Sequence, residues 1–438
     1  MFLEYFFACL SGVASGFVVG LLPGIGPAVV MILVFTIMLK VKMILALIFY
    51  CCMMSACQFG GSITALAAGL PGETNSFPLL KIRPQLIEQD LQSSALFLCA
   101  AGHVIGALST FAISYLIIDR IADSTAYLRS YVMVGFGILG MILCMAFSDN
   151  RWYISLAMFV SAWILARVGI NLETRQYFMT FDNLWLSGGL PTISVILGIY
   201  AFPSVLRSLE QRIEVTDKEF NFSKNISNKL ILLKGNFFAI VRGNLIGFFS
   251  GIIPYVGIDL SSYIAFYVER SLKKSILNQI IASETATNAA GISVLLPLLI
   301  YGIAIQPSES ILLEAVNSGH NVVNWATVSP MFTTIAVWLV IANMACFFLS
   351  WNLVGPVISS LRACSRYVPW FMCAMCVYTV YSIGVLYGQS VYYISVMLVF
   401  GIIGYLLRAR DTLPFIFIFM LQHSLESAIL RFYYIYIQ

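Results

Sequence analysis

Long apolar stretches separated by short polar breaks run along almost the whole chain. Stretches of about 20 residues, enough to cross the hydrocarbon core of a bilayer as a helix, lie at 2–22, 95–118, 131–147, 152–170, 188–206, 235–253, 330–350, 391–407 and 413–435. The regions 24–80 and 254–305 are also apolar, but proline, glycine and polar residues interrupt them. The pattern predicts an all-α protein, a polytopic transmembrane helical bundle of roughly ten to twelve spans.

Composition agrees with a chain that lives in a lipid bilayer. Apolar residues make up 60% of the 438 residues and charged residues 10%, whereas soluble proteins carry about 25% charged residues. The mean hydropathy of +0.91 excludes a disordered chain. The net charge of +4 is small, and no basic block forms a footprint for nucleic acid. The start, Met1-Phe2-Leu3-Glu4, lacks a positive n-region, so we expect the first apolar stretch to be a retained helix.

The longest polar interval divides the chain near its middle. Residues 207–234 contain six Lys and Arg residues, a bias that favours the cytoplasmic side of a membrane. We therefore predict a first transmembrane repeat at 1–206, a cytoplasmic linker at 207–234 and a second transmembrane repeat at 235–438.

A glycine and proline pattern recurs on the two sides of this linker. Gly12, Gly16, Gly20, Pro23 and Gly26 reappear, at one constant offset, as Gly243, Gly247, Gly251, Pro254 and Gly257. Small residues four apart are common where membrane helices pack, so part of the match can arise independently. That motif does not explain the proline and the final glycine. The pattern predicts an internal duplication, and transporter precedent favours an inverted arrangement of the two repeats.

Each copy of the pattern ends in a proline-containing break, because proline lacks an N–H group and cannot continue a helix. Inside a membrane the freed backbone is tolerated only where protein or a water-filled cavity satisfies it. A break repeated in both halves, as broken or re-entrant helices, indicates the central site of a secondary transporter. Simple kinks that serve packing are the alternative.

Polar, glycine-rich segments follow both breaks and supply the candidate binding residues. Short hydroxyl and amide side chains beside glycine can hold a dehydrated cation or hydrogen-bond a carboxylate. The candidate substrate- and ion-binding residues are Gly24, Gly26, Gly60, Gly61, Ser62, Thr64, Pro71, Gly72, Glu73, Thr74, Asn75, Gly257, Asp259, Ser283, Glu284, Thr285 and Asn288. We expect Glu284, with Asn288 one helical turn later, to hold the coupling ion, either Na⁺ or H⁺.

Three charged or titratable residues have a second interpretation. Glu284 is either an intramembrane functional carboxylate or an acid at a helix N-terminus, where it favours the dipole. Asp259 faces an ion or, as we favour, caps a short helix. His103 can relay protons, because imidazole changes charge between about pH 5 and 8, but a hydrogen-bonded packing histidine is the interpretation that we favour.

The motifs together resemble the large membrane subunit of the tripartite tricarboxylate transporter family. The resemblance rests on LLPGIGPAVV, FGGSITALAAGLPGE, IASETATNAAG, the stretch from Thr174 to Asp182, the GIYA of 198–201 and the C-terminal LPFIFIFMLQHSLESAILR. It implies a multi-pass protein of the bacterial inner membrane, a small four-helix membrane subunit and a periplasmic solute-binding protein as partners, and an organic-acid substrate. It also implies transport driven by an ion gradient, which agrees with the lack of a phosphate-binding G-x-x-x-x-G-K-[ST] motif.

Two other functions stay open. Altered motifs, such as Leu80-Lys81-Ile82-Arg83-Pro84 where the family carries Asp-Gly, make a degenerate non-transporting homologue or scaffold credible. An intramembrane enzyme needs a nucleophile–base pair or a metal cluster, and three dispersed histidines do not indicate either one. Cys373 and Cys376 lie in an apolar run without further ligands. We therefore expect no enzyme activity, no cofactor and no resident metal.

Overall fold

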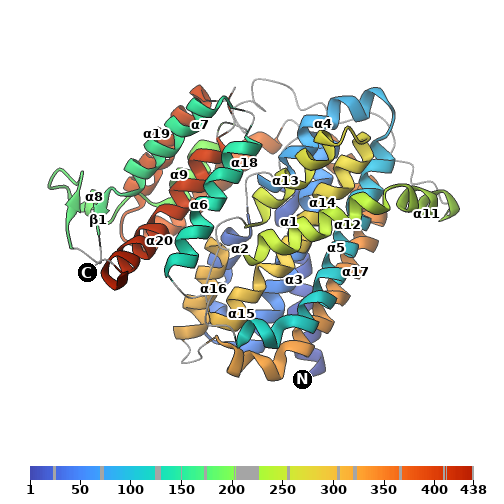
Figure 1. The fold of residues 1–438 in the computed structure, drawn as a ribbon, viewed down its shortest axis with the longest axis horizontal. Helices are drawn as coiled ribbons and strands as arrows, with labels where there is room; N and C mark the ends of the chain where they lie inside the picture. Colours follow the sequence, from blue (N-terminus) through green and yellow to red (C-terminus); the bar gives the residue numbers. More distant parts are fainter. Residues whose placement is uncertain are drawn as a thin grey trace. The chain divides into compact units, whose positions relative to one another are not determined.

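The structure of the protein is a computed structural model (Figure 1). It describes residues 1–22, 26–69, 74–123, 130–148, 150–171, 175–201, 203, 226–253, 257–302, 306–318, 323–364, 367–407, 410 and 412–436. Within these ranges, five helical segments are long and apolar enough to cross a membrane: Phe2–Leu21, Met43–Ala67, Gln92–Ala122, Ile276–Tyr301 and Trp325–Ser350. Shorter apolar helical segments lie at Val134–Ala146, Trp152–Ala166, Phe237–Ile252 and Ser390–Leu406. The all-α class predicted from the sequence is confirmed.

The chain divides into two compact units, each built from residues on both sides of the predicted linker. The first unit comprises Met1–Asp123 with Arg212–Val368, and the second comprises Ser124–Gln211 with Pro369–Gln438. Helix α11 (Ile226–Gly235) occupies the C-terminal part of the predicted linker.

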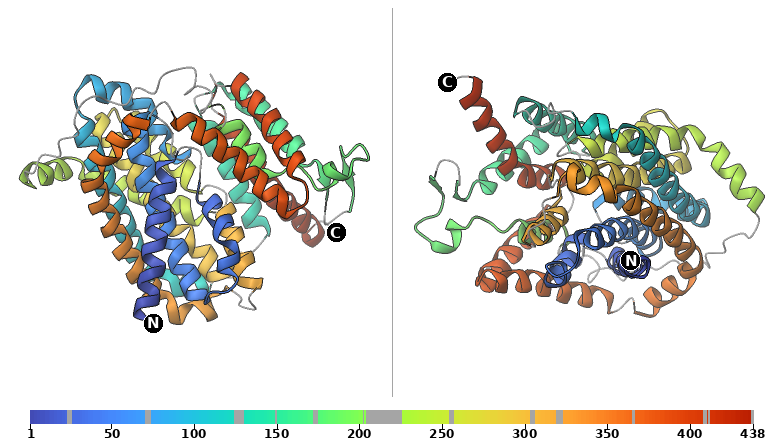
Figure 2. Two further views of the ribbon diagram at one scale, coloured as in Figure 1. Left: turned by 180° about the vertical axis from the view of Figure 1, so that it is seen from behind. Right: turned by 90° about the horizontal axis from the view of Figure 1, so that it is seen from below.

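The first unit contains most of the long helices. They are α1 (Phe2–Leu21), α2 (Pro27–Met38), α3 (Met43–Ala68), the 3₁₀ turn η1 (Thr74–Ser76), α4 (Phe77–Glu88), α5 (Gln92–Ala122), α12 (Phe237–Ile252), α13 (Gly257–Ser271), α14 (Ile276–Ser293), α15 (Leu295–Tyr301), α16 (Pro307–Ser318) and α17 (Trp325–Cys364). Helix α1 packs along α3, and α12 packs along α14. Helices α5 and α17 then pack on α14 and α3, respectively, and Figure 2 shows these helices from two further sides.

Glycines allow the backbones of these pairs to touch, and we call them the glycine contacts: Gly12, Gly16 and Gly20 on α1, and Gly243, Gly247 and Gly251 on α12. A β-carbon at Gly12 would lie 2.5 Å from the carbonyl oxygen of Phe49, and one at Gly16 would lie closer still to that of Met53. On α12, β-carbons at Gly243 and Gly247 would meet the carbonyl oxygens of Ala282 and Ala286. Helices approach this closely only where side chains are absent.

Helix ends flank the two predicted breaks. Helix α1 ends at Leu21 and α2 begins at Pro27, while α12 ends at Ile252 and α13 begins at Gly257. The prolines themselves, Pro23 and Pro254, lie outside the described residues. Gly257 has φ +64°, a left-handed backbone that glycine adopts without strain.

The second unit contains α6 (Ser130–Phe147), α7 (Trp152–Ala166), α8 (Leu184–Ser187), α9 (Thr192–Ile196), the π-helical turn η3 (Leu197–Ala201), α18 (Val368–Leu386), α19 (Ser390–Leu406) and α20 (Leu413–Tyr436). Helix α20 packs on α6 and α7. An ion pair between the Arg167 Nη2 and Glu426 Oε1 atoms, 3.2 Å apart, ties α20 to the residue after α7.

Two predicted spans of the second unit differ in the structure. The stretch 152–170 is helical only to Ala166, and β1 (Gly169–Ile170) pairs antiparallel with β2 (Tyr177–Phe178). The stretch 188–206 begins with a non-helical segment in which Gly189 has φ +80°, followed by Pro191, and the helix starts only at Thr192. Gly189 and Pro191 therefore delay the start of the second of these helices.

Candidate functional site

Helix α14 is the buried element on which the candidate site is built. Its side chains from Ile280 to Ser293 are all buried, and most of them are small residues such as Ala, Ser and Thr. Small side chains let α12, α5, α13 and α3 pack around one helix. Glu284, 1% exposed, lies in the middle of this helix and not at its N-terminus, so the interpretation as a helix N-terminal acid is wrong.

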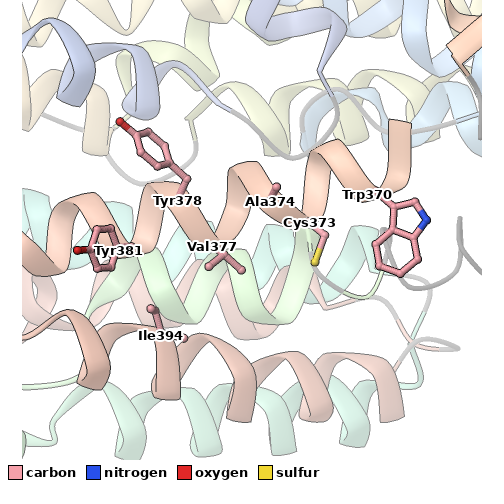
Figure 3. A pocket seen from close by; sticks show the side chains of 7 residues that line it. All are labelled: Trp370, Cys373, Ala374, Val377, Tyr378, Tyr381 and Ile394. Carbon is pink, nitrogen blue, oxygen red and sulfur yellow. The ribbon is translucent and has the colours of Figure 1, made fainter. Parts of the chain in front are cut away.

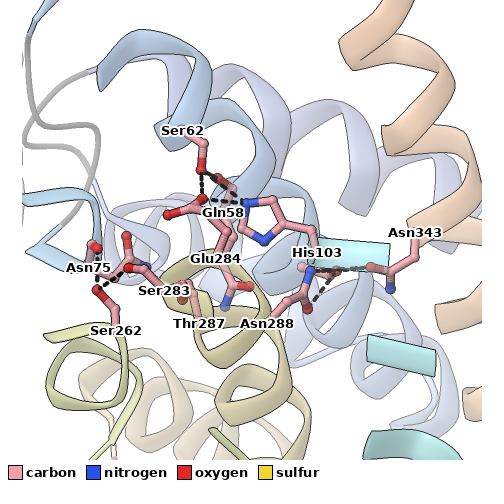
Figure 4. Close-up of polar contacts among 11 residues, drawn as sticks. Gln58, Ser62, Asn75, His103, Ser262, Ser283, Glu284, Thr287, Asn288 and Asn343 are labelled. Carbon is pink, nitrogen blue, oxygen red and sulfur yellow. Dashed lines mark hydrogen bonds and ion pairs between the residues drawn. The ribbon is translucent and has the colours of Figure 1, made fainter. Parts of the chain in front are cut away.

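Two side chains from neighbouring helices, Ser62 on α3 and His103 on α5, contact Glu284 on α14 (Figure 4). We call these three residues the polar cluster. The Ser62 hydroxyl donates a hydrogen bond to Glu284 Oε2. The His103 Nε2 atom lies 3.0 Å from Glu284 Oε2 and 3.0 Å from Ser62 Oγ. Both the imidazole and the carboxylate are almost completely buried.

Further polar atoms around the polar cluster have no hydrogen-bond partner among the described residues. They include His103 Nδ1, Thr285 Oγ1, and both Oε1 and Nε2 of Gln58 on α3. The imidazole of His103 packs against Phe59 with 4.7 Å between ring centroids. Buried polar groups are normally hydrogen-bonded, so this region can accept water or polar atoms of a ligand.

The polar cluster contains the residue types of a serine hydrolase triad without its geometry. In a triad the serine and the acid bind opposite nitrogens of the imidazole, so that the acid orients the base. Here Ser62 and Glu284 both contact Nε2. The cluster therefore does not form the relay that activates a serine for covalent catalysis.

Asn288 belongs to a second hydrogen-bonded group, one turn further along α14. Its amide nitrogen lies 3.3 Å from the Asn343 Oδ1 atom on α17 and 3.5 Å from the Ser55 hydroxyl on α3. The Ser55 hydroxyl donates to the same Asn343 oxygen at 2.9 Å. Asn288 therefore does not share a hydrogen-bond partner with Glu284, although both lie on α14.

Ser283 and Asn75 are connected through a third group. The Ser262 hydroxyl on α13 donates to the Asn75 carbonyl oxygen at 2.6 Å, and the Ser283 hydroxyl lies 3.4 Å from Ser262 Oγ. Figure 4 shows these three residues beside the polar cluster. The structure thus connects Asn75 of the first predicted polar segment to Ser283 of the second through Ser262.

The other predicted residues have mixed surroundings. Gly60 packs on α1, where an added β-carbon would lie 2.5 Å from the Phe17 carbonyl oxygen. Thr64 donates to the Leu21 carbonyl oxygen at 3.1 Å, and Gly61 is buried on α3. A β-carbon added at Gly26 would meet no atom within 4 Å. Gly24, Pro71, Gly72 and Glu73 lie outside the described residues, as do the side chains of Thr74 and Asp259.

The most informative residue that sequence reasoning undervalued is His103. It is hydrogen-bonded, as expected, but its partner is Glu284. Gln58, Ser55, Asn343 and Ser262 were not predicted at all. Their sequence signal is a polar residue inside an apolar helix, which marks burial or function but names no partner.

A buried ion pair lies in the same unit. Glu269 on α13 is fully buried, and its two oxygens lie 2.5 Å and 2.9 Å from Nε and Nη2 of Arg242 on α12. The pair is bidentate, the geometry in which a guanidinium compensates a buried carboxylate best. Each charge is therefore satisfied by the other.

In the second unit, an open hollow of about 610 Å³ is apolar in character (Figure 3). It is lined by Trp370, Cys373, Ala374, Val377, Tyr378, Tyr381 and Ile394. None of these side chains carries a charge. Over the described ranges, no three His, Cys, Asp or Glu side chains gather as metal ligands.

The tripartite tricarboxylate transporter TctA family matches residues 6–418. A relative from Agrobacterium vitis, an uncharacterized 52.8 kDa protein in the TAR-I ttuC' 3' region, is 25% identical over 442 residues, which cover 97% of this chain and 86% of that protein. No solved structure is significantly similar to the chain. Because the family match spans nearly the whole sequence, this multi-pass membrane protein belongs to the tripartite tricarboxylate transporter TctA family.

Proposed function

We propose that the chain is the transport-conducting subunit of a secondary transporter that imports small carboxylates across the bacterial inner membrane, driven by a Na⁺ or H⁺ gradient. The observation that carries this proposal is the polar cluster, because it joins helices of both predicted halves around a buried carboxylate. An ionisable group inside the membrane is costly and therefore indicates an ion or substrate pathway.

The packing of the first unit supports two repeats related by a pseudo-twofold axis. Gly12, Gly16 and Gly20 face Phe49, Met53 and Cys57, while Gly243, Gly247 and Gly251 face Ala282, Ala286 and Ala290. Both sets therefore advance four residues at a time on both helices. Ser55 lies six residues after Phe49, and Asn288 lies six residues after Ala282. These equivalent positions hydrogen-bond to each other, as residues beside such an axis would.

Family membership supports the partners that we propose. They are a small four-helix membrane subunit and a periplasmic solute-binding protein that delivers an organic acid. The substrate is a tricarboxylate or a related acid. Within the described ranges, the hydroxyl of Thr285 has no hydrogen-bond partner and is suited to such an anion.

Uptake measurements test the proposal directly. The chain is co-expressed with the genes that neighbour it, and membrane vesicles are supplied with radiolabelled di- and tricarboxylates under imposed Na⁺ or pH gradients. We expect uptake of at least one acid that stops when ionophores collapse both gradients and does not need ATP. Vesicles without the chain are the control.

Two outcomes would overturn the proposal. Uptake that survives collapse of both gradients but stops without ATP would exclude a secondary transporter. A lack of uptake for every acid, from a complex that assembles normally, would favour the non-transporting homologue.

A further inference from the structure

We propose that the coupling ion is a proton and that the polar cluster of Ser62, His103 and Glu284 is its binding site. This inference rests on the proposed function and chooses between the two ions left open there.

The hydrogen bonds fix where protons lie in the cluster. Ser62 has one hydroxyl proton and two possible acceptors, Glu284 Oε2 and the Gln58 carbonyl oxygen 3.1 Å away. The ionised carboxylate is the stronger acceptor, so we assign the proton to the bond with Glu284. The Ser62 oxygen can then only accept from His103 Nε2, which lies 3.0 Å away. An N–H at Nε2 also suits Glu284 Oε2, because a lone pair there would repel the carboxylate. Neutral His103 therefore carries its proton on Nε2 and exposes a lone pair at Nδ1.

The remaining position for a proton is thus Nδ1, or Glu284 itself. The His103 Nδ1 atom is buried and has no hydrogen-bond partner within the described ranges. A proton bound at Nδ1 converts the imidazole into an imidazolium beside the carboxylate. The net charge of the cluster then changes from −1 to zero, with no other atom transferred.

This neutralisation has a large energetic consequence at a buried site. A single ionised carboxylate removed from water costs several kcal/mol unless it is paired. Glu284 is 1% exposed, and His103 is the basic side chain in contact with it. The arrangement in which Glu284 is buried between the helices is therefore more stable with the proton bound than without it.

The surrounding charged and titratable groups do not supply this compensation. Arg242 on α12 is bound bidentately to Glu269 on α13. Lys81 on α4 donates to the Tyr267 hydroxyl at 2.8 Å. Cys99 on α5 is also buried, but a thiol brings no positive charge. On α3, the neighbours Ser62 and Gln58 are neutral.

The donor set also argues against Na⁺ at this point. Hard cations prefer oxygen ligands, whereas imidazole suits softer transition metals. Here an imidazole nitrogen occupies the position next to the carboxylate oxygen. A carboxylate–imidazole pair can instead accept a proton at either group.

Because the polar cluster lies between the two predicted halves, its protonation is coupled to their relative movement. Ser62 and His103 belong to the first predicted half, and Glu284 belongs to the second. Loss of the proton leaves a buried net charge between the halves, which is relieved when the halves separate and water enters. Proton binding favours the closed arrangement, so the gradient biases a two-state element.

The first test uses accumulation and exchange in proteoliposomes of the assembled complex. The probe is the acid that the wild type takes up best, supplied in Na⁺-free choline buffer with an imposed pH gradient. We expect the wild type to accumulate it. Glu284→Gln and His103→Gln should lose accumulation at least about tenfold, while Glu284→Gln keeps exchange of labelled for unlabelled acid, because a permanently neutral side chain resembles the protonated state.

A matched control separates this role from mere burial. Glu309 on α16 is also a fully buried glutamate of the first unit, but its Oε2 atom accepts from the backbone N–H of Gln306 at 3.0 Å. Glu309→Gln should keep accumulation driven by the pH gradient. Loss of accumulation in this variant to the same extent as in Glu284→Gln would overturn the assignment.

A second measurement does not depend on transport. A pH-indicator dye counts the protons that the purified complex binds between about pH 8 and pH 5. Glu284→Gln should bind one proton fewer than the wild type, and Glu309→Gln should bind the same number. Equal proton binding by wild type and Glu284→Gln would overturn the inference even if no carboxylate were transported.

The outcomes distinguish the inference from the proposed function. Uptake that requires Na⁺ at clamped pH and ignores the pH gradient would overturn the proton assignment and leave the transporter intact. Absence of uptake under every gradient would overturn the transporter, and the dye titration would then decide whether the cluster binds a proton.

Discussion

At the glycine contacts, the backbones of two helices touch, whereas at the polar cluster polar side chains from three helices contact one another. A β-carbon at Gly16 or Gly247 would collide with the carbonyl oxygen of Met53 or Ala286. Ser62, His103 and Glu284 instead interact through specific atoms. The first kind of contact depends on shape alone and holds helices inside each predicted half together. The second depends on protonation and hydrogen bonding and connects the halves.

We expect the largest loss of stability at the glycine contacts, where steric fit alone determines the packing. Gly16→Val places two methyl groups against α3 and cannot relax, because the opposing atom is backbone. Overpacking costs about 1–3 kcal/mol or more even against side chains, so we expect little monodisperse protein after extraction. Size-exclusion chromatography and the midpoint of thermal unfolding measure the loss.

Gly235→Ala is the control for this variant, because open space surrounds Gly235 on α11. It should be extracted and unfold like the wild type. A normal yield and stability of Gly16→Val would show that α1 and α3 are not in backbone contact.

A charged contact should give the next largest effect. Arg242→Met leaves the fully buried carboxylate of Glu269 without its partner, and breaking a buried pair costs about 3–5 kcal/mol. The double variant Arg242→Met with Glu269→Gln removes both charges and should recover much of that loss. Thermal unfolding of the three proteins checks this order, and additive effects of the two substitutions would contradict it.

Asn343 tests the hydrogen-bonded group beside the polar cluster. Asn343→Ala removes the oxygen that both Ser55 and Asn288 contact. Leaving buried polar groups unsatisfied costs about 1–3 kcal/mol, which lowers the midpoint of thermal unfolding. Ser11→Ala on the exposed side of α1 is the control, since Ser11 bonds only to carbonyl oxygens of its own helix.

The smallest effect is expected for Ser55→Ala. The Asn288 and Asn343 amides still contact each other at 3.3 Å when the hydroxyl is removed. The substitution removes the 2.9 Å bond to Asn343 and the long 3.5 Å contact with Asn288, and a typical hydrogen bond contributes about 0.5–1.5 kcal/mol. If thermal unfolding shows Ser55→Ala to be as harmful as Asn343→Ala, the hydroxyl and not the amide pair organises this group.

Much of the fold could be predicted from the sequence, because a membrane helix is a local feature. The predicted stretches 2–22 and 413–435 correspond closely to α1 and α20. The spacing of Gly12, Gly16 and Gly20 also predicted a packing face, since four-residue steps return to one side of a helix. Prediction was wrong where Gly189 and Pro191 override hydropathy.

The candidate site was less accessible to sequence reasoning. Ser62, His103 and Glu284 lie 41 to 222 positions apart, and their meeting depends on which helix packs on which. Hydropathy carries no information about that pairing. Glu284 could be selected because a carboxylate in an apolar segment is costly, but its partner His103 was identified only from the packing of α5 on α14.

The four-residue spacing of the glycine contacts also limits how far α1 can slide along α3, and α12 along α14. Moving α1 along α3 by part of a turn would bring a side chain against each carbonyl oxygen that now faces a glycine. The next position with glycines in register lies about 6 Å away, at 1.5 Å per residue. The contact therefore opposes sliding of one helix along the other. We expect α1 and α3 to move as one rigid body, and α12 and α14 as another. Any gating motion should then take place between these two helix pairs.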